Sequence, residues 1–437
     1  MLMKRRKFLK ISGLFSAFAF SGSLQTIFHD SKSALNKSSL LKDPNNVLDI
    51  HKSLSYKIIS TKGDLMSDGN LVPGKADGMS AFSVDPSHTV LVRNHELNRS
   101  SGRLLGPFKN SSKKVISLGK SHYDPTAFGG TTNIVINDST NKVVKEFLSL
   151  SGTMTNCAGG PTPWNTWLTC EENTSKNKKE NISHGYVFEV DPKKDYLQEP
   201  IPLKRMGRFS HEAVAFDKYG CAYLTEDRGE GLLYKFIPDR KGSLIEGKLY
   251  ALKINHQDTR NWKKASIPTG KEYNVKWVRL KDPDPVDDDL RIKGYEKGAS
   301  IFARGEGITS DGNSIYFTCT SGGKYRRGQI WKLTPVSKSR AKLKLWFEIS
   351  NTDMINMPDN LTVAPWGDLI VCEDNPDIIR LWGIKPDGSV YLIAENNYTG
   401  SELAGVCFNQ KNNTMYVNIQ HNGQTLAIKG DWNSVRL

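Results

Sequence analysis

Short apolar runs that stop abruptly at polar residues recur along this chain. Most copies follow a partner run and a turn that contains Asp, Asn or Gly, as residues 213–220 do before the copy at 222–227. Apolar runs on either side of such turns predict β-hairpins. Six copies stand about 45 to 95 residues apart, at residues 90–96, 167–172, 222–227, 315–320, 369–374 and 415–420.

This repeat, without any sustained helical period, predicts an all-β fold. We expect a six-bladed β-propeller with inserted loops, which forms one catalytic domain over residues 51–437. The charged segments 175–180 and 255–289 are expected to be surface insertions. The alternative is a β-sandwich built from ordinary hairpins.

A second set of polar residues lies just before the partner strands and includes Glu212, Glu306, Asp359 and Glu402. In a propeller, the start of each innermost strand lies near the central channel, so these groups would converge. Bound cations explain such convergence, and oxygen-rich sets suit Ca²⁺ or trivalent iron. For any single acid, a solvated loop carboxylate is the alternative. The full acidic set is Glu171, Glu172, Glu212, Glu306, Asp359, Glu373, Asp374 and Glu402.

Two further residues carry candidate chemistry. Cys157 lies in a Gly/Pro-rich loop, where a thiolate ligand would favour a transition metal, although an ordinary loop thiol is the alternative. Arg304 stands two residues before Glu306 and could clamp a tetrahedral oxyanion or pair with the neighbouring acids. His95 and His211 each precede a glutamate, and we interpret both as structural histidines.

Composition narrows the function classes. The net charge of +14 comes mostly from scattered lysines. It could attract anionic substrates, or it could reflect a lysine-rich proteome. No basic cluster alternates with aromatic residues along one helix, so nucleic acid is not an expected partner. Six cysteines would allow disulfides in an oxidising location outside the cytoplasm. Five of them lie in apolar, strand-like runs, however, so the presence of disulfides stays open.

The N-terminus predicts export. Residues 4–10 read Lys-Arg-Arg-Lys-Phe-Leu-Lys and precede a short, weakly apolar run. This pattern is typical of a twin-arginine signal, which we place at residues 1–35, followed by a flexible linker at 36–50. We therefore expect the twin-arginine translocase as a partner and a periplasmic or extracellular location. No stable membrane span should remain after processing, and we expect a monomer.

Several motifs together resemble the PhoX family of exported alkaline phosphatases. The most specific is the cysteine loop Asn-Cys-Ala-Gly-Gly-x-Thr-Pro-Trp at 156–164, followed by Thr-Cys-Glu-Glu at 169–172. The others are Gly-Arg-Phe-x-His-Glu at 207–212, Arg-x-Glu-Gly at 304–307, Pro-Asp-Asn at 358–360 and Met-Tyr-Val-Asn-Ile-Gln-His at 415–421.

This resemblance implies a short member of a family of six-bladed propellers that hydrolyse phosphomonoesters at a mixed Fe³⁺ and Ca²⁺ site. It implies that Cys157 bridges metals, that Glu212 and Glu306 hold iron, and that Arg304 clamps phosphate. Calcium ligands are implied among Glu171, Glu172, Asp359, Asn360 and Glu373.

Two other functions stay open from the residues alone. A calcium-dependent, lactonase-type propeller would use Glu, Asn and Asp around one Ca²⁺ and would need no thiolate. A non-catalytic exported propeller would bind a partner or a polysaccharide. Iron in stoichiometric amount would exclude the simple calcium lactonase.

Overall fold

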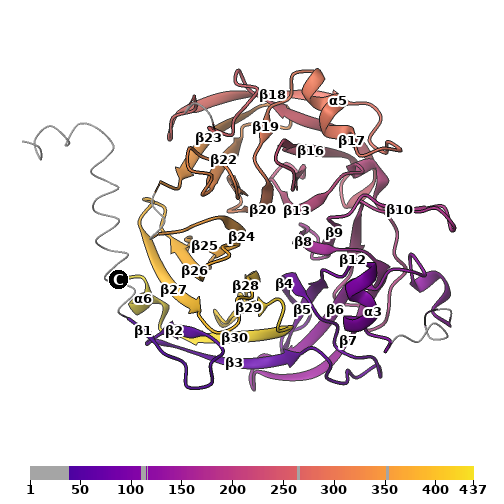
Figure 1. Ribbon diagram of the computed structural model, residues 1–437, viewed down its shortest axis with the longest axis vertical. Coiled ribbons are helices and arrows are strands. Elements are labelled where there is room, and N and C mark those ends of the chain that lie inside the picture. The colour runs from indigo at the N-terminus through magenta and orange to yellow at the C-terminus, as the bar shows by residue number, and fades with distance from the viewer. Residues whose placement is uncertain (1–38, 110–114, 116, 263–265, 351–353) are drawn as a thin grey trace, which may run out of the picture.

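β-Sheets surround a central axis in this protein (Figure 1). The computed structural model describes residues 39–109, 115, 117–262, 266–350 and 354–437, so the expected signal at 1–35 lies outside the described residues. The predicted all-β, propeller-like fold is confirmed. In the described part of the chain, no helix is long and apolar enough to cross a membrane.

The N-terminal half builds two smaller sheets and part of a large one. A four-stranded sheet contains β4 (Ala76–Ser83), β5 (His88–His95), β6 (Gly129–Asn137) and β7 (Lys142–Thr153), and a three-stranded sheet contains β8 (Asn156–Pro161), β9 (Trp167–Glu171) and β12 (Val187–Val190). The large sheet has nine strands in the order β13 (His211–Phe216), β14 (Ala222–Glu226), β16 (Tyr234–Arg240), β17 (Ser243–Lys253), β18 (Glu272–Leu280), β23 (Ala341–Glu348), β22 (Gln329–Pro335), β21 (Ile315–Cys319) and β20 (Gly305–Ser310).

Two more sheets complete the ring. One contains β1 (Leu40–Leu41), β2 (Asp49–His51), β27 (Val390–Asn396), β26 (Ile379–Ile384), β25 (Leu369–Glu373) and β24 (Pro358–Val363), and the other contains β28 (Leu403–Phe408), β29 (Met415–Ile419), β30 (Gln424–Gly430) and β3 (Leu54–Thr61). The small elements are the pairs β10 (Lys176–Asn177) with β11 (Ile182–Ser183) and β15 (Gly231–Leu232) with β19 (Ile301–Phe302), the helices α3 (Arg99–Leu105), α5 (Leu290–Glu296) and α6 (Trp432–Val435), and the 3-10 turns η1 (Gly119–Ser121) and η2 (Lys204–Met206).

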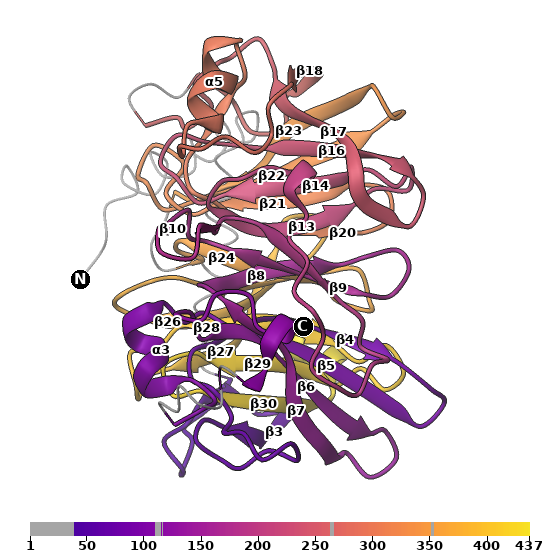
Figure 2. The ribbon, with the colours of Figure 1, turned by 90° about the vertical axis from the view of Figure 1, so that its right-hand side faces the viewer.

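The hydrogen-bonded sheets do not match the six separate blades expected from the sequence. Among the described residues, only four sheets have four or more strands. One reason is that the sheet of β8, β9 and β12 has only three strands, and the other is β18, which lies in a segment expected to be a surface insertion. It pairs with β17 on one side and with β23 on the other, and so joins two units into one sheet (Figure 2).

The expected flexible linker at 36–50 is wrong for its described part. Strand β2 pairs with β27, where Asp49 opposes Glu395 and Ile50 opposes Ala394. Leu48 and Ile50 are buried in the core, and burial of such apolar side chains stabilises the ordered strand. Next along the chain, β3 pairs with β30, so an N-terminal strand completes the sheet of the C-terminal hairpin.

Six inner hairpins share one register. In each of them, the first or second residue of the inner strand opposes the end of the neighbouring strand, and a β-bulge follows at once. Bulges re-aim side chains, and here they do so at the inner rim of the ring. The inner strands β4, β8, β13, β20, β24 and β28 contact one another in a closed ring (Figure 1).

Glycines allow this ring to be tight. A Cβ atom added at Gly160 of β8 would lie 1.7 Å from the carbonyl oxygen of Val214 in β13. One added at Gly405 of β28 would lie 2.2 Å from the carbonyl oxygen of Asp77 in β4. No other residue fits such backbone contacts, so the sequence must supply glycine where neighbouring inner strands meet.

Candidate metal centre

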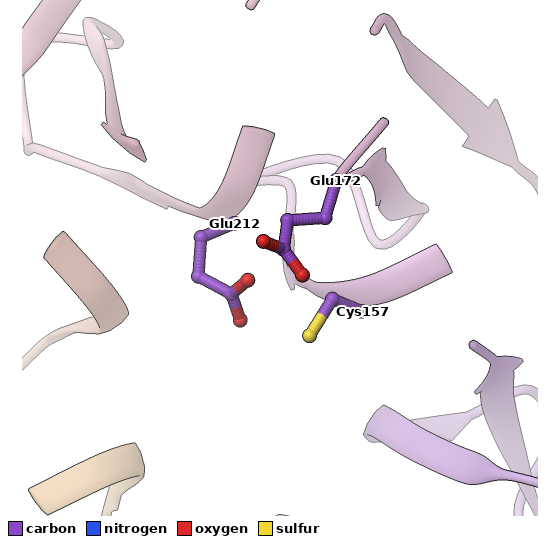
Figure 3. Close-up of side chains that lie close together, drawn as sticks. All are labelled: Cys157, Glu172 and Glu212. Atoms are coloured by element: carbon purple, nitrogen blue, oxygen red, sulfur yellow. The ribbon is translucent and has the colours of Figure 1, made fainter. Parts of the chain in front are cut away.

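The bulges bring polar side chains from different strands to the axis. The second residue of an inner strand is Asp77 in β4, Cys157 in β8, Glu212 in β13, Glu306 in β20 and Asp359 in β24. Figure 3 shows the Cys157 thiol and the carboxylates of Glu172 and Glu212 pointing toward one another. The convergence expected from the sequence is thus present for Glu212, Glu306 and Asp359. Cys157 and Asp77 join them, whereas β28 has Ala404 at this position.

Two groups of donors have the spacing that a metal ion needs. One consists of Cys157, Glu172 and Glu212, and the other of Glu212, Glu306 and Asp359. Within each group, the ligand atoms lie within 4.8 Å of one another. Glu212 belongs to both groups, and both of its carboxylate oxygens are buried without a described hydrogen-bond partner. A shared carboxylate with two unsatisfied oxygens fits a pair of neighbouring cations.

Electrostatics also favours cations here. Burial, together with the like charges of Glu306 and Glu172, holds the pKa of Glu212 well above its usual range. Burial and Asp227 raise the pKa of Glu172 to about 8. The pKa of the Cys157 thiol is raised by burial and then by Asp77. A bound cation would favour the ionised form of each of these groups.

A second layer of the site comes from the residues that follow the second strand of each hairpin. The backbone N–H of five of them donates to the carbonyl of the residue before the inner strand, over 2.8 to 3.1 Å. This bond holds each residue beside the axis regardless of its side chain. The five donor and acceptor pairs are Glu96 with Lys75, Glu172 with Thr155, Thr320 with Arg304, Asp374 with Met357 and Gln420 with Glu402.

Arg304 is held by acids from three directions. Its Nε donates to Asp227 Oδ1 over 2.9 Å, its Nη1 to Asp374 Oδ2 over 3.2 Å, and its Nη2 to Asp227 and Glu306. The attraction of Glu306 raises the pKa of the guanidinium further above its usual value. About a third of the side chain is exposed (31%), so it stands at the open side of the centre.

Two acids expected to bind calcium are committed elsewhere. The Glu171 carboxylate accepts hydrogen bonds from the backbone N–H groups of Met154 and Gly185, and it lies 2.7 Å from Nδ1 of His184. The Glu373 carboxylate accepts from Asn356 N and Trp382 Nε1. Both end a strand whose side chains alternate, so they face the interior of the sheet unit while the next residue faces the axis.

Asn360 and Glu402, two further predicted ligands, differ in what surrounds their side chains. Asn360 Oδ1 accepts from Gly405 N over 2.8 Å, so this oxygen joins β24 to β28. Glu402 is at the centre, where burial and the charges of Asp359 and Asp374 raise its pKa to about 8. Of the two predicted ligands, Glu402 is thus the one with its carboxylate among the central acids.

The two histidines are structural, as expected. His95 is buried with Nδ1 2.9 Å from Gly74 O and Nε2 2.9 Å from Thr132 Oγ1. His211 is buried with Nε2 2.9 Å from Gly207 O, and its ring stacks on Phe209 at 3.6 Å between centroids. The described cysteines are all free, so no disulfide links them.

Several residues of the centre were not predicted from the sequence. Asp77 is buried, and its Oδ2 accepts from Gln420 Nε2 over 2.8 Å. Asp227 is bidentate on Arg304, and Glu96 pairs with Lys75. Each occupies a repeat position that was recognised in other hairpins, so a strict alignment of the six hairpins would have found them.

A family model matches most of the chain. The model of alkaline phosphatase PhoX matches residues 35–423. The chain belongs to the PhoX alkaline phosphatase family. The predicted resemblance is confirmed, and the reaction of an alkaline phosphatase is the hydrolysis of phosphomonoesters. No curated protein sequence matches the chain.

One solved structure supports the fold. Pseudomonas fluorescens PhoX in complex with vanadate, a transition state analogue, matches with a TM-score of 0.68 at 18% identity, over 88% of this chain and 96% of that one. A gluconolactonase from Xanthomonas campestris reaches a TM-score of only 0.46 at 10% identity, over 86% of this chain and 98% of that one. The PhoX likeness shows that this chain has the PhoX fold.

Proposed function

We propose that this PhoX family member hydrolyses phosphomonoesters at a centre of Fe³⁺ and Ca²⁺ on the axis. The observation that carries the proposal is the pair of donor groups that share Glu212, whose carboxylate oxygens have no other described partner. Cys157 adds a soft ligand to the first group, which favours a transition metal there. The all-carboxylate group with Glu306 and Asp359 suits a hard cation.

In this proposal the chain provides most of the positioning. When bound, the cations supply Lewis acidity toward the phosphoryl oxygens. Arg304 offers a flat, paired set of donors at the open side, and its Nη1 uses only one of its two N–H groups in the described contacts. The guanidinium would stabilise the charge that builds up on the phosphoryl group in the transition state.

The test combines an assay, a metal analysis and a spectrum. Purified protein should turn over p-nitrophenyl phosphate with Ca²⁺ present, contain iron in stoichiometric amount and absorb visible light. Arg304→Ala should lose at least about 100-fold in kcat/KM with an unchanged metal content. Full activity of this variant would contradict the role proposed for Arg304. An active enzyme that is colourless and free of iron would contradict the proposed iron site.

The number of blades belongs to the same proposal. Six inner hairpins with one register support a six-bladed propeller in which β18 joins two blades into the nine-stranded sheet. The calcium lactonase alternative has less support, because a thiol belongs to one of the two donor groups.

The last part of the proposal is export by the twin-arginine pathway. It rests on residues 4–10 of the sequence. Replacing Arg5 and Arg6 by Lys should retain the protein and its activity in the cytoplasm, as cell fractionation would measure. Secretion of this variant would overturn the assignment. Size-exclusion chromatography of the exported protein should give a monomer.

A further inference from the structure

Six equivalent residues stand just before the inner strands, at the entrance to the axis. They are Lys75, Thr155, Ser210, Arg304, Met357 and Glu402. Two of the six are cations, and these two share two features of the backbone. Lys75 and Arg304 both have a left-handed backbone, with φ of 48° and 53°. The carbonyl of each accepts a hydrogen bond from the residue that follows the second strand of its hairpin.

The two cations stand on opposite sides of the ring of inner strands. The inner strands contact one another in the ring order β4, β8, β13, β20, β24, β28, and back to β4. Lys75 precedes β4 and Arg304 precedes β20, so they are three positions apart in a ring of six. Figure 1 shows β4 and β20 on opposite sides of the axis. Any group bound on the axis therefore lies between a lysine and an arginine.

Lys75 has unused donors. Its ammonium carries three N–H groups, and the described structure uses one of them, toward Glu96 Oε2 over 3.2 Å. The side chain is 23% exposed, and that of Arg304 is 31% exposed, so both are partly open to solvent. Arg304, in contrast, directs four hydrogen bonds at carboxylates.

The backbone at this position does not require a lysine. Thr155 and Met357 adopt the same left-handed conformation without a charge, with φ of 52° and 53°. A side chain at positive φ costs about 1 kcal/mol or more, and glycine would avoid this cost. Since neutral side chains adopt the same conformation at this position, the charge of Lys75 is not needed to build the turn.

We propose that Lys75 is a second substrate-contacting cation, which holds the phosphoryl group from the side opposite Arg304. This inference rests on the proposed function. It assigns to the centre a specificity for a doubly charged phosphoryl group, because two cations on opposite sides can each bind a separate phosphoryl oxygen.

The decisive variant is Lys75→Gly, which removes the ammonium and suits the left-handed backbone. On metal-loaded protein, calorimetric titration with inorganic phosphate should show at least tenfold weaker binding than wild type. Turnover of p-nitrophenyl phosphate should fall at least tenfold in kcat/KM. Metal content and melting temperature should be unchanged or higher. Lys75→Arg should restore phosphate affinity to within about threefold, because it returns a cation.

The control is Lys62→Met. Lys62 follows β3, and its ammonium donates to His421 O, so this substitution removes an equal charge that has no described contact with the acids of the centre. Unchanged phosphate affinity of Lys75→Gly, or an equal loss in Lys62→Met, would overturn the proposal. A wild type that binds phosphate but hydrolyses no phosphomonoester would instead overturn the proposed function and leave the role of Lys75 as an anion contact.

Discussion

Glu171 and Glu172 are neighbours in sequence, yet they belong to two different regions of the molecule. Glu171 ends β9 and binds the backbone of two loops inside its sheet unit, whereas Glu172 points at the axis beside Cys157. The same division recurs twice, in the pairs Glu226 with Asp227 and Glu373 with Asp374.

This difference shows that identical residue types one position apart can have opposite tasks. The first acid has its charge met by hydrogen bonds and so stabilises the fold. The second is surrounded by like charges and needs a cation. Substitutions in the two regions should therefore separate loss of stability from loss of metal.

The largest expected effect is in the centre. Glu212→Ala removes the carboxylate shared by both donor groups. We expect loss of bound metal and a fall of at least about 1000-fold in kcat for p-nitrophenyl phosphate. Elemental analysis and a steady-state assay measure this. Retained metal with full activity would show that the two groups do not form the site.

The next effect is inside the sheet unit. Glu171→Ala leaves the N–H groups of Met154 and Gly185, and the charged side of His184, without their acceptor. Loss of one partner from a buried charged network costs about 3 to 5 kcal/mol. Chemical denaturation should show this loss, while correctly folded protein keeps its metal. A variant that is fully stable but free of metal would place Glu171 in the centre after all.

A smaller effect depends on pH. Burial disfavours the charged imidazole of His184, but Glu171 and Asp124 outweigh it and raise the pKa of His184 to about 9. Because this pKa lies above the unfolded value of about 6.5, the stabilisation is complete below pH 6.5 and is lost as the pH rises through 9. It amounts to about 3 kcal/mol at most.

Urea denaturation of the wild type and of His184→Gln from pH 6 to pH 10 measures the stabilisation by the charged His184. The difference in unfolding free energy between the two proteins should shrink as the pH increases. A difference that is constant over this range would mean that the imidazole is neutral in the folded protein.

The smallest effect has the opposite sign. In metal-free protein, the pKa of Glu172 is raised to about 8, by burial first and then by Asp227. At pH 9 its carboxylate is ionised among like charges, and Glu172→Gln removes this repulsion. Burial of the unpaired amide offsets most of the gain, so the chelated protein should be more stable by about 1 kcal/mol. At pH 5 the carboxyl is protonated and the substitution should change little. Denaturation with a chelator present at both pH values measures this, and destabilisation at pH 9 would contradict it.

Much of this protein follows from its sequence alone. The alternation of apolar runs and polar ends determined an all-β repeat, because a strand buries alternate side chains and must end in a turn. The Cys157 loop and the Arg304 to Glu306 segment pointed to the family and to most of the central residues.

Only the tertiary structure decided which acid of each pair faces the axis, since one residue of bulge or register reverses every side chain. It also placed Lys75 opposite Arg304, because that relation depends on the closing of a ring by residues 229 positions apart in the chain. The joining of two units by β18, and of residues 39–50 to the sheet of β27, are likewise pairings between distant segments that no local pattern encodes.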